Sequence, residues 1–386
     1  MRRLVVIGWG MRWVAVVLLS GCSSILGIDD FKLGDAGGGE MMGDGGGGYC
    51  LGPTGWRVCL TAEPTNAPVM ISSSLMFDTT SSPLCAPQQP ASWKAAGQPD
   101  ACFIISTQVT FAAPIVQAIG GRPLVVFASD SITVSTQLDV ASRSASPPSI
   151  GPASPSMMCT PPMAAVDNTA AASGGAGGSF MTKGGDGGNS SAGPQGGRAS
   201  AANAQAPTIL RAGCEGGRGG NATEQGGLQG AGGGAVYLVA GNRITINGFI
   251  NASGSAGRGG GRLAGGGGGG SGGMIHLHAP AIAGNAGVLV ANGGAGGGGG
   301  GNQQLGASGA DPTPQMPQMI AIGGSGGSGG GAGGNGFAGT TLATIGANGT
   351  PTTAAAGGGG GGASGFIRAN IALSQITTSP AVTVVP

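Results

Sequence analysis

The sequence of 386 residues has little charge, few aromatic side chains and almost no histidine. Charged residues make up 8% of the chain and aromatic residues 4%, and there are two histidines. Soluble domains carry about 25% charged residues, so this is not the composition of an ordinary globular enzyme. Charge-driven disorder requires a high net charge and is excluded as well. With few aromatic rings, any core has to be built in thin layers from Val, Ile, Leu and Ala.

Basic residues are too few and too scattered for nucleic-acid binding. Lys and Arg total 16 and Asp and Glu total 15. Removing residues 1–21 would take away three arginines, which leaves 13 basic against 15 acidic residues and a net charge of −2. Nucleic-acid recognition needs cations clustered on one face of a domain. The sequence therefore predicts no nucleic-acid partner.

Motifs for nucleophilic catalysis, phosphate binding and calcium binding are missing or accidental. Gly-x-Ser-x-Gly occurs at 269–273, 323–327 and 326–330, but each copy lies in poly-Gly rather than between a strand and a helix. There is no Gly-Lys-Ser/Thr motif for a P-loop. The stretch 184–189 lacks the spacing of a calcium-binding repeat, and the other glycine tracts have almost no carboxylates. We predict no catalytic residue and no cofactor.

An export signal opens the sequence. Three arginines precede an apolar run over residues 13–19, which is too short to span a bilayer and is typical of a secretory signal. The run ends in Leu-Ser-Gly-Cys22, which resembles the bacterial lipobox, in which the cysteine is acylated. We predict a lipoprotein signal peptide over 1–21 and a membrane anchor on Cys22. By resemblance to enterobacterial sorting, Ser23 indicates the outer membrane, facing either the periplasm or the surface.

Six cysteines remain once Cys22 is assigned to the anchor. An even number in an exported protein indicates disulfides. The spacing of a zinc site, such as Cys-x-x-Cys, is absent. Proximity in the sequence favours the pairs Cys50–Cys59, Cys85–Cys102 and Cys159–Cys214.

The chain divides into four regions. Residues 1–21 form the signal peptide, and 22–48 are expected to form a flexible Gly-rich tether. Residues 49–121 carry four cysteines and two β-like runs, which indicates a disulfide-clamped N-terminal β cap. Residues 122–386 combine short β-like runs with glycine tracts.

The last region repeats a unit of three short runs, each with the period-two alternation of a strand. The units begin with Leu124–Ala128, Ala235–Ala240, Met274–Ala279 and Gly365–Ala369. One unit cannot bury its apolar face alone, whereas stacked units can. We therefore predict an all-β fold, a parallel β-helix-like solenoid over 122–386 with long Gly-rich loops. The alternatives are a β-sandwich with disordered insertions, or a mostly disordered chain.

Glycine tracts occupy roughly 173–234, 254–273, 293–336 and 346–365, and the chain has 88 glycines in all. Glycine loses the most backbone entropy on folding and offers no side chain in return. The tracts therefore either remain mobile or pack as extended, three-fold strands of the polyglycine II type. Strict Gly-X-Y periodicity is absent, which excludes collagen.

A polysaccharide lyase or hydrolase on a β-helix would need acids paired on neighbouring coils. Asp130 and Asp139 are the acids of the first unit, and alignment of the second unit places Gly241 and Asn251 opposite them. No acidic column forms, and Arg243 near Asp130 is interpreted as a surface ion pair. An enzyme would need at least three of the following in one groove: Asp100, Asp130, Asp139, Arg243 and His276.

The two histidines, His276 and His278, alternate with Ile275 and Leu277 on one run. They would share the face opposite the apolar residues. A His-x-His pair can begin a metal site, but no third ligand is identifiable. We interpret the pair as part of a solvated strand face, with a metal site as the weaker alternative.

Three stretches resemble a group of bacterial proteins. The start Leu-Ser-Gly-Cys22-Ser-Ser-Ile-Leu-Gly-Ile-Asp-Asp-Phe resembles predicted lipoproteins of myxobacteria. Residues 123–132 and 233–241 are similar to large Gly-rich proteins of the same bacteria, which are often labelled PE-PGRS-like. The helical Pro-Glu domain of mycobacterial members is missing here. The resemblance implies a cell-envelope address and no particular activity.

These observations favour a lipid-anchored envelope protein that is not an enzyme. Its expected function is surface adhesion, matrix interaction or envelope structure, with polysaccharide or envelope proteins as partners. The alternative is a polysaccharide-active lyase or hydrolase.

Overall fold

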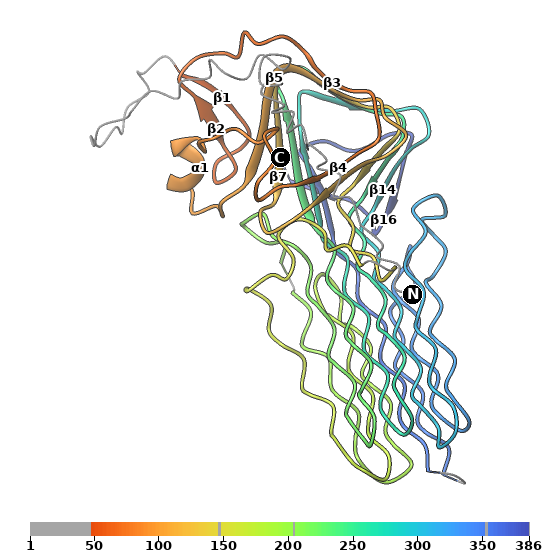
Figure 1. Ribbon diagram of the computed structural model, residues 1–386. Helices are drawn as coiled ribbons and strands as arrows, with labels where there is room; N and C mark the ends of the chain where they lie inside the picture. Colours follow the sequence, from red (N-terminus) through yellow and green to blue (C-terminus); the bar gives the residue numbers. More distant parts are fainter. Residues whose placement is uncertain (1–47, 146–147, 204, 352–353, 386) are drawn as a thin grey trace, which may run out of the picture.

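The protein is elongated, with its strands gathered at one end and a bundle of extended chain running to the other (Figure 1). The computed structural model describes residues 48–145, 148–203, 205–351 and 354–385. We call the strand-rich end the head (residues 48–145, 235–251, 274–290 and 366–385). We call the Gly-rich extended chain of the other end the glycine bundle (residues 163–203, 205–234, 252–273, 291–351 and 354–365). The predicted signal peptide, Cys22 and the tether up to residue 47 lie outside the described residues.

Two open sheets of parallel strands form the body of the head. The nine-stranded sheet has the order β13-β10-β7-β9-β12-β15-β17, with β5 paired to β7 and β3 to β5. Its strands are β3 (Val69–Ile71), β5 (Cys102–Phe111), β7 (Leu124–Val134), β9 (Ala235–Ala240), β10 (Arg243–Ile246), β12 (Met274–His278), β13 (Ala281–Ala283), β15 (Phe366–Ala369) and β17 (Thr383–Val384). The six-stranded sheet has the order β16-β14-β11-β8-β6-β4. Its strands are β4 (Leu75–Asp78), β6 (Val116–Ile119), β8 (Gln137–Asp139), β11 (Phe249–Asn251), β14 (Gly287–Val290) and β16 (Ile376–Ser379).

Equivalent runs of the first three sequence units lie beside one another. Leu124 pairs with Val236, which in turn pairs with Ile275. In the six-stranded sheet Leu138 pairs with Ile250, and Ile250 with Leu289. The fourth unit differs, because β16 takes the third position and the expected run, β17, pairs with β15 instead.

The main core lies between the two sheets. Alternate residues of the nine-stranded sheet point into it, among them Val126, Leu238 and Ile275, all fully buried. Leu138 and Leu289 enter the same core from the six-stranded sheet. The side chains are mostly Val, Ile, Leu and Ala, as expected for a thin core in a chain with few aromatic residues.

The opposite face of the nine-stranded sheet is covered as well. An antiparallel hairpin, β1 (Tyr49–Leu51) and β2 (Val58–Leu60), and a short helix, α1 (Ala91–Ala95), belong to this side of the head. Trp56 and Trp93 pack against Phe103 and Tyr237 of the sheet in a second core. Most of the aromatic residues of the described chain lie here.

The predicted fold class is wrong. The strands form open sheets rather than a closed or solenoid sheet. The chain leaves for the glycine bundle after β8, β11 and β14 and returns from it before β9, β12 and β15, so successive units are not joined by short turns into coils. The region predicted as a separate cap supplies β3 to β6 to the same two sheets.

Three disulfides are present, between the cysteines that are neighbours in sequence. Cys50–Cys59 joins the two strands of the hairpin, and Cys85–Cys102 ties a loop to the start of β5. Cys159–Cys214 links the segment beside the bundle to a glycine tract. The disulfide prediction is confirmed.

The glycine tracts are ordered and hydrogen-bonded to one another in three directions. The backbone amides of Gly268, Gly269 and Gly270 donate hydrogen bonds to three different tracts, and each donor–acceptor distance is 2.9 Å. The acceptors are the carbonyl oxygens of Gly217, Gly360 and Ser255. The next amide, that of Ser271, returns to the first of these tracts at Cys214. A three-residue period of this kind is that of the polyglycine II helix, so the packed alternative predicted from the sequence is the one observed.

Glycine is required inside the bundle because the backbones touch. A Cβ atom on Gly268, Gly269 or Gly270 would lie between 1.9 and 2.1 Å from a carbonyl oxygen. These oxygens belong to three different tracts, at Ala176, Gly294 and Ala231. Outer tracts need glycine only toward their neighbours, as in Gly184-Gly185-Asp186-Gly187-Gly188-Asn189, where every third residue carries a side chain.

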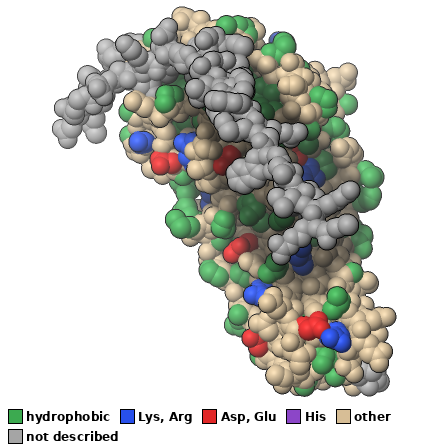
Figure 2. Space-filling view, viewed as in Figure 1, with side chains coloured by type: hydrophobic (Ala, Val, Ile, Leu, Met, Phe, Trp, Pro, Cys, Tyr) green, Lys and Arg blue, Asp and Glu red, His purple; other side chains and the backbone are tan. Residues whose placement is uncertain are grey.

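Charged side chains are sparse on the surface, and those in view in Figure 2 are scattered over both regions. The ion pairs of the described chain are Asp139–Arg143, Lys183–Asp186 and Glu224–Arg262. Among the described residues, no helix combines the length and hydropathy needed to cross a membrane.

Candidate functional site

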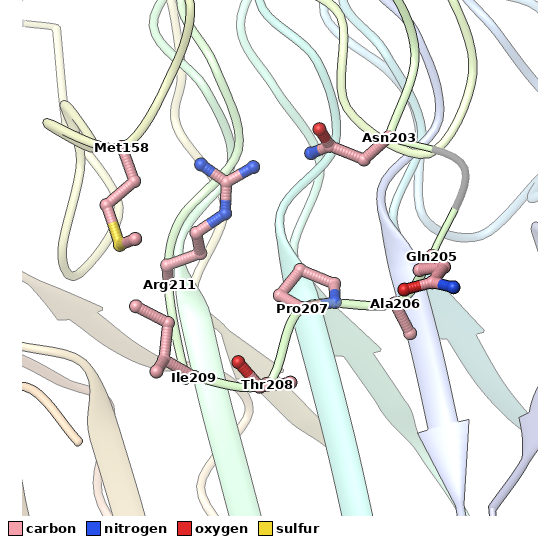
Figure 3. A pocket seen from close by; sticks show the side chains of 8 residues that line it. All are labelled: Met158, Asn203, Gln205, Ala206, Pro207, Thr208, Ile209 and Arg211. Carbon is pink, nitrogen blue, oxygen red and sulfur yellow. The ribbon is translucent and has the colours of Figure 1, made fainter. Parts of the chain in front are cut away.

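A cavity of about 530 Å³ lies where the bundle meets the nine-stranded sheet. A volume of this size is within the range of small-molecule sites. The residues that line it carry one charge and several neutral polar groups: Met158, Asn203, Gln205, Ala206, Pro207, Thr208, Ile209 and Arg211. Figure 3 shows the crossing segment 205–209 in front of the strands, with the Arg211 side chain extending between Met158 and Asn203.

Gln98 fixes the crossing segment from the head. Its Nε2 donates to the carbonyl oxygens of Gly55 and Thr208, at 2.7 and 3.0 Å. Its Oε1 accepts the backbone amide of Leu210 at 2.9 Å. Gln98 is buried and Leu210 is fully buried, so these bonds are shielded from water. The wall of the cavity is therefore held in place by the fold.

Arg211 is the charged residue of the cavity, and it is 8% exposed. Its guanidinium carbon lies 4.4 Å from the centre of the Phe180 ring, in a cation–π contact. Its Nη1 makes a long contact of 3.7 Å with Sγ of Cys159, which belongs to the disulfide with Cys214. Burial lowers the pKa of Arg211. None of the ion pairs in the described part of the chain includes it.

A second buried arginine approaches the same segment from the sheet. Arg368 of β15 is 7% exposed, and its Nη1 donates to the carbonyl oxygen of Pro207 at 2.7 Å. The guanidinium lies 5.0 Å from the Trp56 ring. Its Nε is buried without a hydrogen-bond partner in the described chain, and burial lowers its pKa.

His276 is buried beside Arg368, not solvated. It is 1% exposed and lies between Trp56 and Tyr237, with ring centres 4.5 and 4.6 Å away. The expected solvated face is wrong here because the hairpin covers it, although His276 does point away from Ile275 and Leu277. Burial, followed by the charge of Arg368, puts the pKa of His276 well below its usual range.

His278 is half-buried, and burial lowers its pKa. Neither histidine has a hydrogen-bond partner on Nδ1 among the described residues. Within the same residues, no group of three or more His, Cys, Asp or Glu could hold a metal ion.

The acidic residues that the sequence offered as candidates for catalysis lie apart from one another and are already hydrogen-bonded. Asp130 accepts hydrogen bonds from the side-chain amides of Gln108 and Asn242, at 2.8 and 3.0 Å. The bond from Asn242 makes the largest contribution to lowering the pKa of Asp130, and the bond from Gln108 the next largest. Asp139 is fully buried, paired with Arg143 and bonded to Asn251 at 3.0 Å. The register places Asn251 opposite Asp139, as the alignment predicted.

Asp100 accepts a hydrogen bond from Gln89 and borders a second hollow next to the cavity. Asp130, Asp139, Arg243 and His276 line neither this hollow nor the cavity itself. The pairing of Arg243 with Asp130 is not observed, because Asp130 bonds to the two amides instead. The structure thus does not bring these five residues together.

The sequence reasoning missed Arg211 and Gln98, although one signal was present. Arg211 is a lone cation in an apolar and glycine-rich stretch, three residues before a cysteine predicted to form a disulfide. Chemically, the site offers a fixed guanidinium for an anion and amide and hydroxyl groups for further hydrogen bonds. Comparisons of the chain with protein-family models, with curated proteins and with solved structures found no match.

Proposed function

We propose that the protein is an exported, lipid-anchored component of the cell envelope that acts without catalysis, in adhesion, matrix interaction or envelope structure. The observation that carries this proposal is the glycine bundle. Its inner tracts meet mainly through backbone and small side chains, and most of their hydrogen bonds are made inside the bundle. Such a body has no room for side-chain chemistry but is well suited to hold a binding surface at a fixed distance.

The export signal and the disulfides support the location. The lipobox-like Leu-Ser-Gly-Cys22 would supply the anchor, through acyl chains on the cysteine. Disulfides persist in the oxidising compartments outside the cytoplasm, and the structure has three. The resemblance to Gly-rich, PE-PGRS-like labelled lipoproteins of myxobacteria favours the same address, with the outer membrane as the expected membrane.

The anchor is tested by replacing the acyl acceptor. Cys22→Ser should abolish acyl labelling and release the protein from membranes. Ser23→Ala is the matched control, because it changes the neighbouring residue and leaves the thiol. Membrane retention of Cys22→Ser equal to that of the unchanged protein would contradict the anchor.

Catalysis is tested by incubating the full chain with isolated envelope and matrix polysaccharides. We expect the protein to sediment with the polysaccharide and to create no new reducing or unsaturated chain ends. New ends would favour the alternative, a polysaccharide lyase or hydrolase. That alternative requires neighbouring acids, whereas Asp130 and Asp139 are each engaged in their own bonds.

A further inference from the structure

We propose that the cavity beside Arg211 binds a carboxylate, and that its ligand is a uronic-acid residue of an acidic polysaccharide. This inference rests on the proposed function, because it takes the protein to bind matrix or envelope polymers without cleaving them. It adds the binding site and the chemical class of the ligand.

In the described part of the chain, the positive charge of the cavity has no carboxylate to balance it. Arg211 and Arg368 are both more than nine-tenths buried, and both adjoin the crossing segment. Neither has a carboxylate partner among the described residues, and none of the eight residues that line the cavity is acidic. A buried cation is costly unless an anion compensates it. A carboxylate in the cavity would supply the missing charge at Arg211.

The Arg211 guanidinium is held in place but leaves most of its donors unused within the described chain. The Phe180 ring holds one of its faces at 4.4 Å, and the Cys159 sulfur touches Nη1. A guanidinium has five N–H donors in one plane, so most of them remain for a ligand. Such a fork matches the two oxygens of a carboxylate. Arginine is therefore expected to bind here in the bidentate manner that lysine cannot reproduce.

The wall of the cavity around Arg211 is polar and neutral. Asn203, Gln205 and Thr208 line the same cavity as Arg211 and offer amide and hydroxyl groups. Asn203 is exposed, and its side chain points to the same side of the segment as the guanidinium in Figure 3. A uronic-acid ring carries one carboxylate and several hydroxyls, which is the complement of one arginine surrounded by neutral hydrogen-bonding groups.

The cavity adjoins a second hollow. This hollow, of about 360 Å³, shares Met158, Ile209 and Arg211 with the first, and its lining adds the Asp100 carboxylate and the Arg122 guanidinium. Arg211 therefore lies where the two hollows meet rather than at a closed end. A polymer can bind across this point, with one sugar unit on Arg211 and the adjacent units in the two hollows. An isolated anion would occupy only the position at Arg211.

The inference is tested by calorimetric titration of the full chain, in detergent and with its disulfides intact, with oligogalacturonate. The variants are Arg211→Gln, which removes the fork, and Asn203→Ala, which removes one exposed side chain of the wall and leaves the core unchanged. Arg218→Gln is the matched control: it removes the same charge from an exposed position seven residues along the chain. A carboxyl-reduced oligomer of equal length and a peptide with a free C-terminal carboxylate serve as comparison ligands.

We expect oligogalacturonate to bind, with affinity falling at least about tenfold in Arg211→Gln and roughly threefold in Asn203→Ala. Arg218→Gln should stay within about twofold, and the reduced oligomer should not bind. Equal losses in Arg211→Gln and Arg218→Gln, full binding of the reduced oligomer, or stronger binding of the peptide would each overturn the inference.

Failure of this inference and failure of the proposed function give different results. If the intact chain ignores oligogalacturonate but still sediments with neutral polysaccharide, the carboxylate site is refuted and the proposed function stands. If new chain ends appear while Arg211→Gln still weakens binding, the site stands and the non-catalytic function is refuted.

Discussion

The head and the glycine bundle are both built from extended chain, but they satisfy the backbone in different ways. In the sheets, each strand bonds only to strands beside it, and alternate side chains fill cores above and below, as Val126 and Phe127 do. In the bundle, successive amides such as those of Gly268 and Gly269 bond in different directions, and at these glycines the tracts meet backbone to backbone. The head is therefore held mainly by burial of apolar side chains, and the bundle by hydrogen bonds and backbone contact.

The bundle is ordered without a hydrophobic core of the usual kind. Glycine tracts carry the largest entropic cost of folding per residue. Close approach of the backbones offsets it, because most inner amides donate to a carbonyl oxygen of a neighbouring tract. The head should consequently be most sensitive to the removal of side-chain atoms, and the bundle to their addition.

Removal of a disulfide should cost more stability in the bundle than in the head. Removing Cys159–Cys214, with a sequence separation of 55 residues, should lower the free energy of unfolding by about 4 kcal/mol. Removing Cys50–Cys59 in the head, with a separation of 9 residues, should cost about 2.5 kcal/mol, because a shorter loop constrains the unfolded chain less. The double Cys→Ala variants are compared by denaturant unfolding. A larger loss for the hairpin disulfide would mean that loop entropy is not the deciding factor.

The next effect contrasts removal of atoms in the head with addition of one atom in the bundle. Leu238→Ala should cost about 3 kcal/mol, because it leaves a cavity between the sheets. Gly268→Ala should cost about 2 to 3 kcal/mol, although alanine usually favours order over glycine, because its Cβ would lie 1.9 Å from the carbonyl oxygen of Ala176. Thermal unfolding of both variants measures the two losses.

Gly121→Ala is the control for this comparison, since a Cβ there meets its nearest neighbour, Thr80 Oγ1, at an ordinary 3.5 Å. Its melting temperature should change little. If Gly268→Ala were as stable as Gly121→Ala, the tracts would have to be looser than the hydrogen bonds indicate.

The smallest effect is a pH dependence that belongs to the head alone. The pKa of His276 lies well below its usual 6.5 in the folded protein, so below pH 6.5 the unfolded chain binds a proton that the folded chain does not. The contribution of His276 to the free energy of unfolding is therefore fully present above pH 6.5. It is lost as the pH decreases, by up to about 1.4 kcal/mol per pH unit. His276→Phe should flatten unfolding curves between pH 6.5 and 5, whereas His278→Gln should retain most of the slope. An equal slope in His276→Phe would assign the effect to other groups.

The sequence predicted the local features of this molecule better than the long-range ones. Period-two runs located the strands of the first three units, and neighbouring cysteines identified the disulfides, because both depend on residues close in sequence. The solenoid prediction was wrong because the sequence alone does not show whether the glycine tracts are mobile or packed. That decision depends on contacts such as Gly268 with Ala176, which lie far apart along the chain.

The candidate site was hidden for the same reason. Arg211 faces a cavity whose walls come from residues 158, 203 and 205–209, and Gln98 fixes that wall from more than 100 residues away. His276 looked solvent-facing because the hairpin that covers it, residues 49–60, shares no local pattern with β12. Burial of a strand face is a property of the assembled fold and not of the strand.

The three-direction hydrogen bonding of the bundle also sets how its length can change. One inserted residue in the tract 264–273 would turn every later residue by a third of a turn and aim each amide at the wrong neighbour. Three residues would restore every direction and lengthen the tract by about 9 Å. The bundle can therefore be lengthened or shortened only by whole turns of three residues, added to or removed from adjoining tracts together. Its length consequently changes in fixed steps.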